Sequence, residues 1–170
     1  GASVREVLFL GSGTSHGVPM IGCGCPVCTS PDPRDRRYRA SVALTLTSGA
    51  VIVIDVAPEF RLAAVAHRLP RLDAILLTHA HADHIMGLDD VRRFNDIMGR
   101  QIPCLGSTET VQVARRSFPH ADRDFRNDGW PSLGFTAVEG PFEAAGARVT
   151  PIPLLHGRGR VFGYRIGPVA

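Results

Sequence analysis

A short segment in the middle of the chain places four potential metal ligands directly after an apolar strand. The apolar residues 74–77 are followed, within six positions, by His79, His81, Asp83 and His84. In extended backbone, side chains two residues apart point to the same side, so His79 and His81 are expected to face the same way. Asp83 and His84 follow where the chain turns into a helix. Any fold that contains this segment brings four donors to one small volume.

The residue types indicate a metal site. Imidazole suits zinc, iron and nickel, and a carboxylate extends the range to harder metals. Ala80 and Ala82 leave room around the ligands. A single histidine is more often an ordinary core residue, and a polar turn in solvent is the plain alternative. Three histidines and an aspartate at this spacing favour metal binding.

A further candidate ligand lies near the other end of the chain. His156 lies just after the strand-like residues 149–153 and precedes Gly157. A histidine at the end of a strand could reach the metal site as an additional ligand. The alternative is a lone histidine on the surface.

Hydrophobic periodicity predicts strands and helices along the whole chain. Strands are expected at residues 7–10, 42–46, 51–54, 74–77, 102–105, 135–138, 148–153 and 161–166, and helices at residues 59–69, 83–95 and 109–116. Residues 22–39 and 119–132 are expected to form loops, and Ser48-Gly49 a hairpin turn. We therefore expect residues 1–170 to form a single mixed α/β (α+β) domain built in layers.

Three of the four cysteines are crowded into one loop. Cys23, Cys25 and Cys28 offer three thiolates, as a structural zinc site requires. A tetrahedral site needs a fourth ligand, and the candidates are Cys104, the remaining thiol, and the nearby His16. The alternative is a set of reduced, free cysteines.

All 19 basic residues are arginine, and four of them lie close together in one loop. These are Arg34, Arg36, Arg37 and Arg39. Guanidinium groups match phosphate oxygens in a bidentate geometry, so Arg34 and Arg37 are candidates for binding a phosphorylated substrate. A solvated loop surface explains the run equally well. The net charge of +3 is too small to indicate nucleic-acid binding by itself.

The His-x-His-x-Asp-His segment resembles the signature of the metallo-β-lactamase fold. Three further stretches resemble its phosphodiesterase branch, which includes phosphoribosyl 1,2-cyclic phosphate phosphodiesterase: residues 11–19 (GSGTSHGVP), residues 23–28 (CGCPVC) and residues 32–37 (DPRDRR). The resemblance covers nearly the whole chain. It implies a four-layer αβ/βα sandwich with two metal ions between its sheets.

The same resemblance assigns roles to individual residues. It implies that His79, His81 and His156 hold one metal and that Asp83 and His84 hold the second. Asp55, at the end of a predicted strand, would support the ligand loop from behind, and His16 would lie beside the metal loop, where it could contact the substrate.

In such relatives an aspartate that bridges the metals, a further histidine ligand and a histidine that completes the cysteine site come from a later part of the chain. On this basis we expect the C-terminal part of the family fold to be absent after Ala170.

These observations predict a metal-dependent hydrolase, most simply a phosphodiesterase for a small cyclic or nucleotide-like substrate. Two divalent ions, zinc or manganese, would supply a metal-bound hydroxide, and Asp83 would accept its proton. The alternatives are a tRNA-type endoribonuclease, a lactone or thioester hydrolase, and a non-catalytic metal-binding fragment. The endoribonuclease would need a basic arm that grips RNA, and no insertion of that kind is evident in the sequence.

The expected partners follow from the same reasoning. A nucleic-acid partner is not expected, and a homodimer is conceivable. The chain has no apolar run of 18 residues and no leader-like start, which predicts a cytoplasmic protein without a membrane span.

Overall fold

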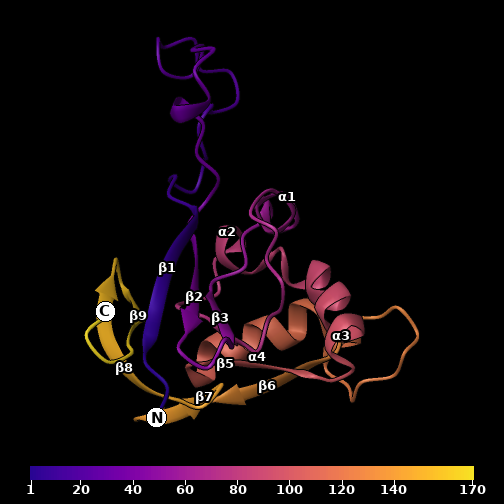
Figure 1. Cartoon of the computed structure of the whole chain (residues 1–170). Helices are drawn as coiled ribbons and strands as arrows, with labels where there is room; N and C mark the ends of the chain where they lie inside the picture. The colour runs from indigo at the N-terminus through magenta and orange to yellow at the C-terminus, as the bar shows by residue number, and fades with distance from the viewer.

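Two β-sheets and one layer of helices make up the domain. A computed structural model describes all residues from Gly1 to Ala170 (Figure 1). The first sheet contains β1 (Val4–Gly11), β2 (Ser41–Leu46), β3 (Val51–Ile54), β4 (Ala74–Leu76), β5 (Ile102–Gly106) and β6 (Leu133–Ala137), in that order. The second contains β7 (Phe142–Ala144), β8 (Ala147–His156) and β9 (Gly159–Arg165).

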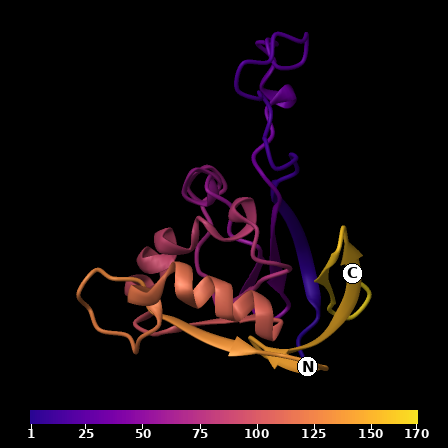
Figure 2. The same cartoon turned by 180° about the vertical axis from the view of Figure 1, so that it is seen from behind.

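The helices lie on one face of the first sheet, and the second sheet lies on the other (Figures 1 and 2). They are α1 (Phe60–Ala66), α2 (Ala82–Ile85), α3 (Arg92–Met98) and α4 (Thr108–Ser117), with 3₁₀ turns η1 (Pro33–Asp35), η2 (Leu88–Val91) and η3 (Pro119–Ala121). The expected mixed α/β fold is therefore confirmed. Residues 1–170 form three layers, and the second sheet carries no helix on its outer face (Figure 2). No helix is both long and apolar enough to cross a membrane.

Two apolar cores hold the layers together. One lies between helices and sheet and includes Phe60, Ile75 and Val111. The other lies between the two sheets and includes Leu76, Val149 and Tyr164. Ile75 and Leu76 are adjacent on β4 and belong to different cores, which is the alternation expected of a strand buried on both faces.

The direction of the strands determines where the polar residues gather. β1, β2 and β3 are antiparallel, whereas β3, β4, β5 and β6 are parallel. Ile54 at the end of β3 pairs with Leu76 at the end of β4. Because parallel strands end at the same edge of a sheet, Asp55 and the histidine segment that follows β4 emerge side by side.

The predicted continuous helix over residues 83–95 is wrong. The segment is divided into α2, η2 and α3, with Gly87 between the first two. The Gly87 N–H donates to the Val56 carbonyl, and a Cβ at position 87 would lie 2.1 Å from the Ala57 carbonyl oxygen. The helix is interrupted there because the backbone at Gly87 packs directly against the loop after β3. The short strand β7 was also not predicted.

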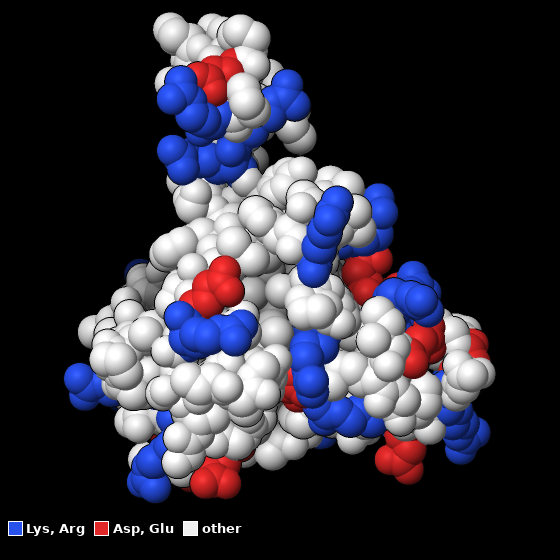
Figure 3. Space-filling view, viewed as in Figure 1, with Lys and Arg blue, Asp and Glu red and all other residues white.

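An arm projects from the body between β1 and β2 (Figures 1 and 3). It comprises residues 12–40, and isolated bridges join its two sides between Gly13 and Arg39 and between Val18 and Arg37. At its base the half-buried Arg39 forms an ion pair with Glu59. Arginines gather on the arm (Figure 3). No basic insertion was evident in the sequence, and the projection of residues 12–40 from the body was not foreseen; whether this arm contacts RNA stays untested.

Candidate metal centre

Histidines from two distant parts of the chain meet at the edge of the first sheet. Ligand nitrogens of His79, His81 and His156 all lie within 4.8 Å of one another. Nε2 of His79 is 3.0 Å from Nδ1 of His81, and the ring centres of His79 and His156 are 5.2 Å apart. His156 is the last residue of β8, so the site joins the two sheets.

A second group of donors lies against the first. The ring centres of His79 and His84 are 4.1 Å apart, and Nε2 of His84 is 3.2 Å from a carboxylate oxygen of Asp83. Asp83 lies in the first turn of α2 and His84 in its last turn. The short helix therefore places His84 beside His79 and Asp83 beside His84.

Asp55 orients the rings of two histidines. Its carboxylate accepts hydrogen bonds from the Thr78 N–H at 2.8 Å, from the Thr78 hydroxyl at 2.6 Å and from Nδ1 of His84 at 2.5 Å. Because the Thr78 hydroxyl gives its proton to Asp55, it can only accept from Nδ1 of His79, at 2.9 Å. In both histidines Nδ1 therefore carries the hydrogen, and the lone pair of His79 Nε2 is directed at the other donors.

The electrostatic environment keeps His79 neutral. Burial, followed by the charge of His84, lowers the pKa of His79 to about 4. Burial also opposes protonation of His84, but the hydrogen bond and the charge of Asp55 outweigh it and raise the pKa of that ring. A neutral imidazole is the form that binds a metal, so His79 is ready to act as a ligand at neutral pH.

The donor set fits a divalent cation. Imidazole nitrogens of His79, His81 and His156 lie within 4.8 Å of one another, and the carboxylates of Asp55 and Asp83 lie beside the neighbouring His84. His79, His81, His84, Asp83 and His156 could hold metal. A carboxylate oxygen of Asp55 also lies within 4.8 Å of ligand nitrogens of His79 and His84. Its hydrogen bonds with Thr78 and His84, however, suit Asp55 to orient the ligands instead of binding the metal.

A cavity of about 410 Å³ opens beside the histidines. His79, His81 and His156 line one part of it, and Glu109, Arg158 and Arg160 line others. These last three residues were missed by sequence reasoning. Only the register of β8 and β9, which pairs His156 with Gly159, reveals that the two arginines lie next to the ligands.

The substrate-binding candidates from the sequence lie elsewhere. Arg34 and Arg37 are exposed on the arm, where Arg34 pairs with Asp32 and Arg37 donates to the Ser12 hydroxyl at 3.0 Å. His16 is also exposed on the arm. None of the three lines the cavity beside the histidines. Spacing along the sequence could not reveal that the arm projects away from the body (Figure 1).

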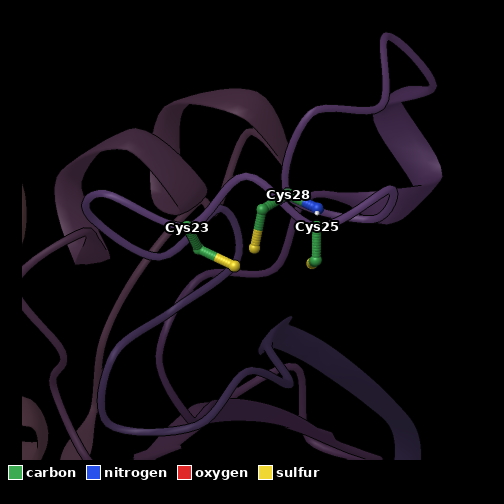
Figure 4. Close-up of side chains that lie close together, drawn as sticks. All are labelled: Cys23, Cys25 and Cys28. Atoms are coloured by element: carbon green, nitrogen blue, oxygen red, sulfur yellow. Dashed lines mark hydrogen bonds between the residues drawn. The ribbon is translucent and has the colours of Figure 1, made fainter.

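The three clustered cysteines come together on the arm (Figure 4). Sulfur atoms of Cys23, Cys25 and Cys28 lie within 4.8 Å of one another. The backbone N–H of Cys28 and the neighbouring thiols lower the pKa of Cys25 to about 7. Cys104 is not a fourth ligand, because it is fully buried in the core under the helices. His16 is not among the residues whose ligand atoms come within 4.8 Å of the three sulfur atoms.

Comparison with known proteins connects this site to a family. Residues 51–169 match the model of the beta-lactamase superfamily domain. An octanoyltransferase of Porphyromonas gingivalis is 38% identical over 165 residues, which is 96% of this chain and 33% of that protein. The chain thus spans about a third of the length of this relative.

Two solved structures are similar over nearly the whole chain. A structure described as a new diphosphatase from the PhnP family has a TM-score of 0.84 and 39% identity, over 95% of this chain and 62% of that one. Zn²⁺-bound PqqB from Methylobacterium extorquens has a TM-score of 0.68 and 20% identity over the same shares, and its likeness shows the fold alone.

Proposed function

Because this chain belongs to the beta-lactamase superfamily, we propose that it is the metal-dependent hydrolase domain of a phosphodiesterase. The observation that carries the proposal is the convergence of His79, His81 and His156 beside the Asp83–His84 pair. The relative with 39% identity is described as a diphosphatase, an enzyme that also cleaves a phosphorus–oxygen bond. We propose a small cyclic or nucleotide-like phosphodiester as the substrate.

The proposed ligands divide into two sets. His79, His81 and His156 would hold one divalent ion, and Asp83 and His84 would hold a second, with zinc and manganese as the candidates. Such ions would supply Lewis acidity at the phosphate and lower the pKa of a water molecule to about 7.

The residues of the chain contribute positioning and proton transfer. Thr78 and Asp55 accept hydrogen bonds from Nδ1 of His79 and His84, respectively, and so leave Nε2 of each ring free to bind a metal. The Asp83 carboxylate, next to Nε2 of His84, is the group placed to accept the proton of the attacking water. The cavity would give the substrate access to His79, His81 and His156, which line it.

The test is a panel of substrates with metal-loaded protein. Bis(p-nitrophenyl) phosphate and nucleoside 2′,3′-cyclic phosphates should be hydrolysed, whereas a lactone and a thioester should not. His81→Ala and Asp83→Ala should each reduce kcat at least about 100-fold. His67→Ala is the matched control, because His67 is exposed at the end of α1 and outside the site. Turnover of the lactone or thioester alone would overturn the choice of substrate.

We also propose that the cysteine cluster binds a structural zinc ion. Three thiol sulfurs within 4.8 Å supply three of the four ligands of a tetrahedral site. The lowered pKa of Cys25 favours its thiolate, which is the form that binds zinc. An ion there would stabilise an arm whose residues 12–40 include none of the core side chains.

A further inference from the structure

A tyrosine of the second sheet donates a hydrogen bond to the strand end that precedes the histidines. The Tyr164 hydroxyl lies 2.6 Å from the carbonyl oxygen of Leu77, which is 87 positions earlier in the sequence. We infer that Tyr164 is a positioning residue, whose hydroxyl holds His156 at the distance from His79 at which both can bind one metal ion. The inference rests on the proposed function and adds to it a residue outside the ligand set that prepares the metal centre.

The end of β4 changes its hydrogen-bonding partner from the first sheet to the second. The Leu77 N–H donates to a carbonyl of β5 at 2.8 Å, whereas the Leu77 carbonyl accepts from Tyr164. The next carbonyl, that of Thr78, accepts from the Phe162 N–H of β9 at 2.9 Å. These two bonds attach β9 to the two residues directly before His79.

The same strand also determines where His156 lies. Phe162 pairs with Pro153 and Gly159 pairs with His156 in the register of β8 and β9. Because the hairpin closes directly after His156, a movement of β9 relative to the first sheet carries this histidine with it. β9 is therefore the common reference for His156, through its pairing with β8, and for His79, through its bonds to the end of β4.

The surroundings of Tyr164 make its hydroxyl a dedicated donor. The side chain is 5% exposed, and burial together with the negative charge of Asp55 raises the pKa of the phenol. The hydroxyl therefore keeps its proton at neutral pH. The ring packs edge-on against Phe142 and Phe162, with ring centres 6.3 and 6.1 Å away. Since these contacts hold the ring, a phenylalanine at position 164 keeps the packing and loses the hydrogen bond.

The test is a double-mutant cycle on metal affinity. Cobalt(II) is the probe, because the visible absorption of a histidine-bound ion differs from that of a thiolate-bound one. Tyr164→Phe should bind cobalt at the histidines about 10-fold more weakly than the unmodified chain, because His156 is held less firmly beside His79. In a His156→Ala background the same change should alter the affinity less than about 2-fold, because no ligand then comes from the second sheet.

Two further variants separate positioning from stability. Tyr38→Phe removes the other tyrosine hydroxyl of the chain, which is exposed on the arm, and should leave the affinity unchanged. Ile52→Val removes one carbon from the core between the sheets, so it should lower the stability and leave the affinity unchanged. An equal loss of affinity in Ile52→Val and Tyr164→Phe would overturn the inference. A loss in Tyr164→Phe that persists in the His156→Ala background would overturn it as well.

Amide exchange in the unmodified chain provides a second test that needs no variant to fold. If the hydroxyl holds the sheets together before a metal binds, the Phe162 amide should exchange slowly in the metal-free protein and about as slowly after cobalt is added. Fast exchange in the metal-free protein would mean that the ion brings the sheets together, and would reject the role of Tyr164.

None of these measurements uses a substrate, so they are independent of the proposed phosphodiesterase activity. A chain that shows the coupling between Tyr164 and His156 but hydrolyses no phosphodiester would reject the proposed function and support the inference. A chain that hydrolyses phosphodiesters without this coupling would do the reverse. The absence of cobalt binding at the histidines would reject both.

Discussion

At the scale of single residues, Asp55 has the most specialised role. Its φ of 60° lies in the left-handed region, which few residues other than glycine adopt, although aspartate tolerates it better than most. The bend turns the carboxylate toward Thr78 and His84 at the end of β3. Because Asp55 is almost fully buried, these hydrogen bonds offset the cost of its burial.

Replacing this carboxylate should weaken metal binding without removing a ligand. We expect Asp55→Asn to reduce zinc affinity about 10–100-fold, because His84 loses its carboxylate acceptor and the Thr78 hydroxyl, which accepts from His79, loses the carboxylate that orients it. Competition with a fluorescent chelator measures the affinity. Asp96→Asn, far from the histidines along α3, is the control and should bind zinc normally. Unchanged affinity in Asp55→Asn would show that Asp55 does not orient the ligands.

The sequence allowed some of the site residues to be identified and concealed others. His79, His81, Asp83 and His84 are close in space because they are close in the sequence. Arg158 and Arg160 join them only because the second sheet packs on the first and a hairpin reverses the chain there. Spacing alone does not encode such long-range contacts.

At the scale of secondary structure, buried strands were predictable and the break in a helix was not. Residues 51–54 form β3 as predicted, since an unbroken run of β-branched residues is a local signal. The interruption at Gly87 depends on the backbone of Val56 and Ala57, which lies about 30 positions earlier. β7 is only three residues long and produces too short a pattern to detect.

A side chain at this break should be costly. Gly87→Ala places a Cβ 2.1 Å from the Ala57 carbonyl oxygen, so the loop after β3 must move. We expect the free energy of unfolding to fall by about 1–3 kcal/mol, measured by urea denaturation. Gly140→Ala, where a Cβ meets no atom within 4 Å, should change it by less than about 0.5 kcal/mol. Similar stabilities of the two variants would contradict the proposed close packing.

The arm can be tested through its metal content. Cys25→Ser should lower the zinc content by one equivalent in elemental analysis and expose the arm to trypsin at Arg34 and Arg36, because the loop loses a ligand. Cys104→Ala, which removes a buried thiol from the core, should leave the zinc content unchanged. Equal zinc contents in Cys25→Ser and the unmodified chain would reject the structural site.

At the scale of the whole molecule, one buried aspartate links several elements. Asp73 accepts from the Val51 N–H at 2.8 Å and forms ion pairs with Arg71 and Arg100 at 2.6 and 2.7 Å. It thereby connects the start of β3, the approach to β4 and the segment after α3. Burial acts to raise the pKa of Asp73, but the hydrogen bonds from Arg71 and Val51 outweigh it and hold that pKa below its ordinary value.

This lowered pKa makes stability depend on pH in the acid range. The contribution of Asp73 is fully present above the unfolded-state pKa of about 3.9 and is lost as the pH falls through the lower pKa of the folded state. Asp73→Asn should therefore be less stable at pH 7, by about 1–3 kcal/mol, and its stability should fall less steeply below pH 4. Urea denaturation at both pH values measures this, with the exposed Asp124→Asn as control. Parallel pH profiles for Asp73→Asn and the unmodified chain would contradict the assignment.

His156 is the only one of the clustered histidines that comes from the second sheet, whereas the others follow β4 of the first. An ion bound by both His156 and His79 would therefore cross-link two sheets that are otherwise held together by apolar side chains. Loading the protein with zinc should raise its melting temperature, and removing the His156 ring should abolish most of that gain. Metal occupancy and the stability of the packing between the two sheets would then be coupled.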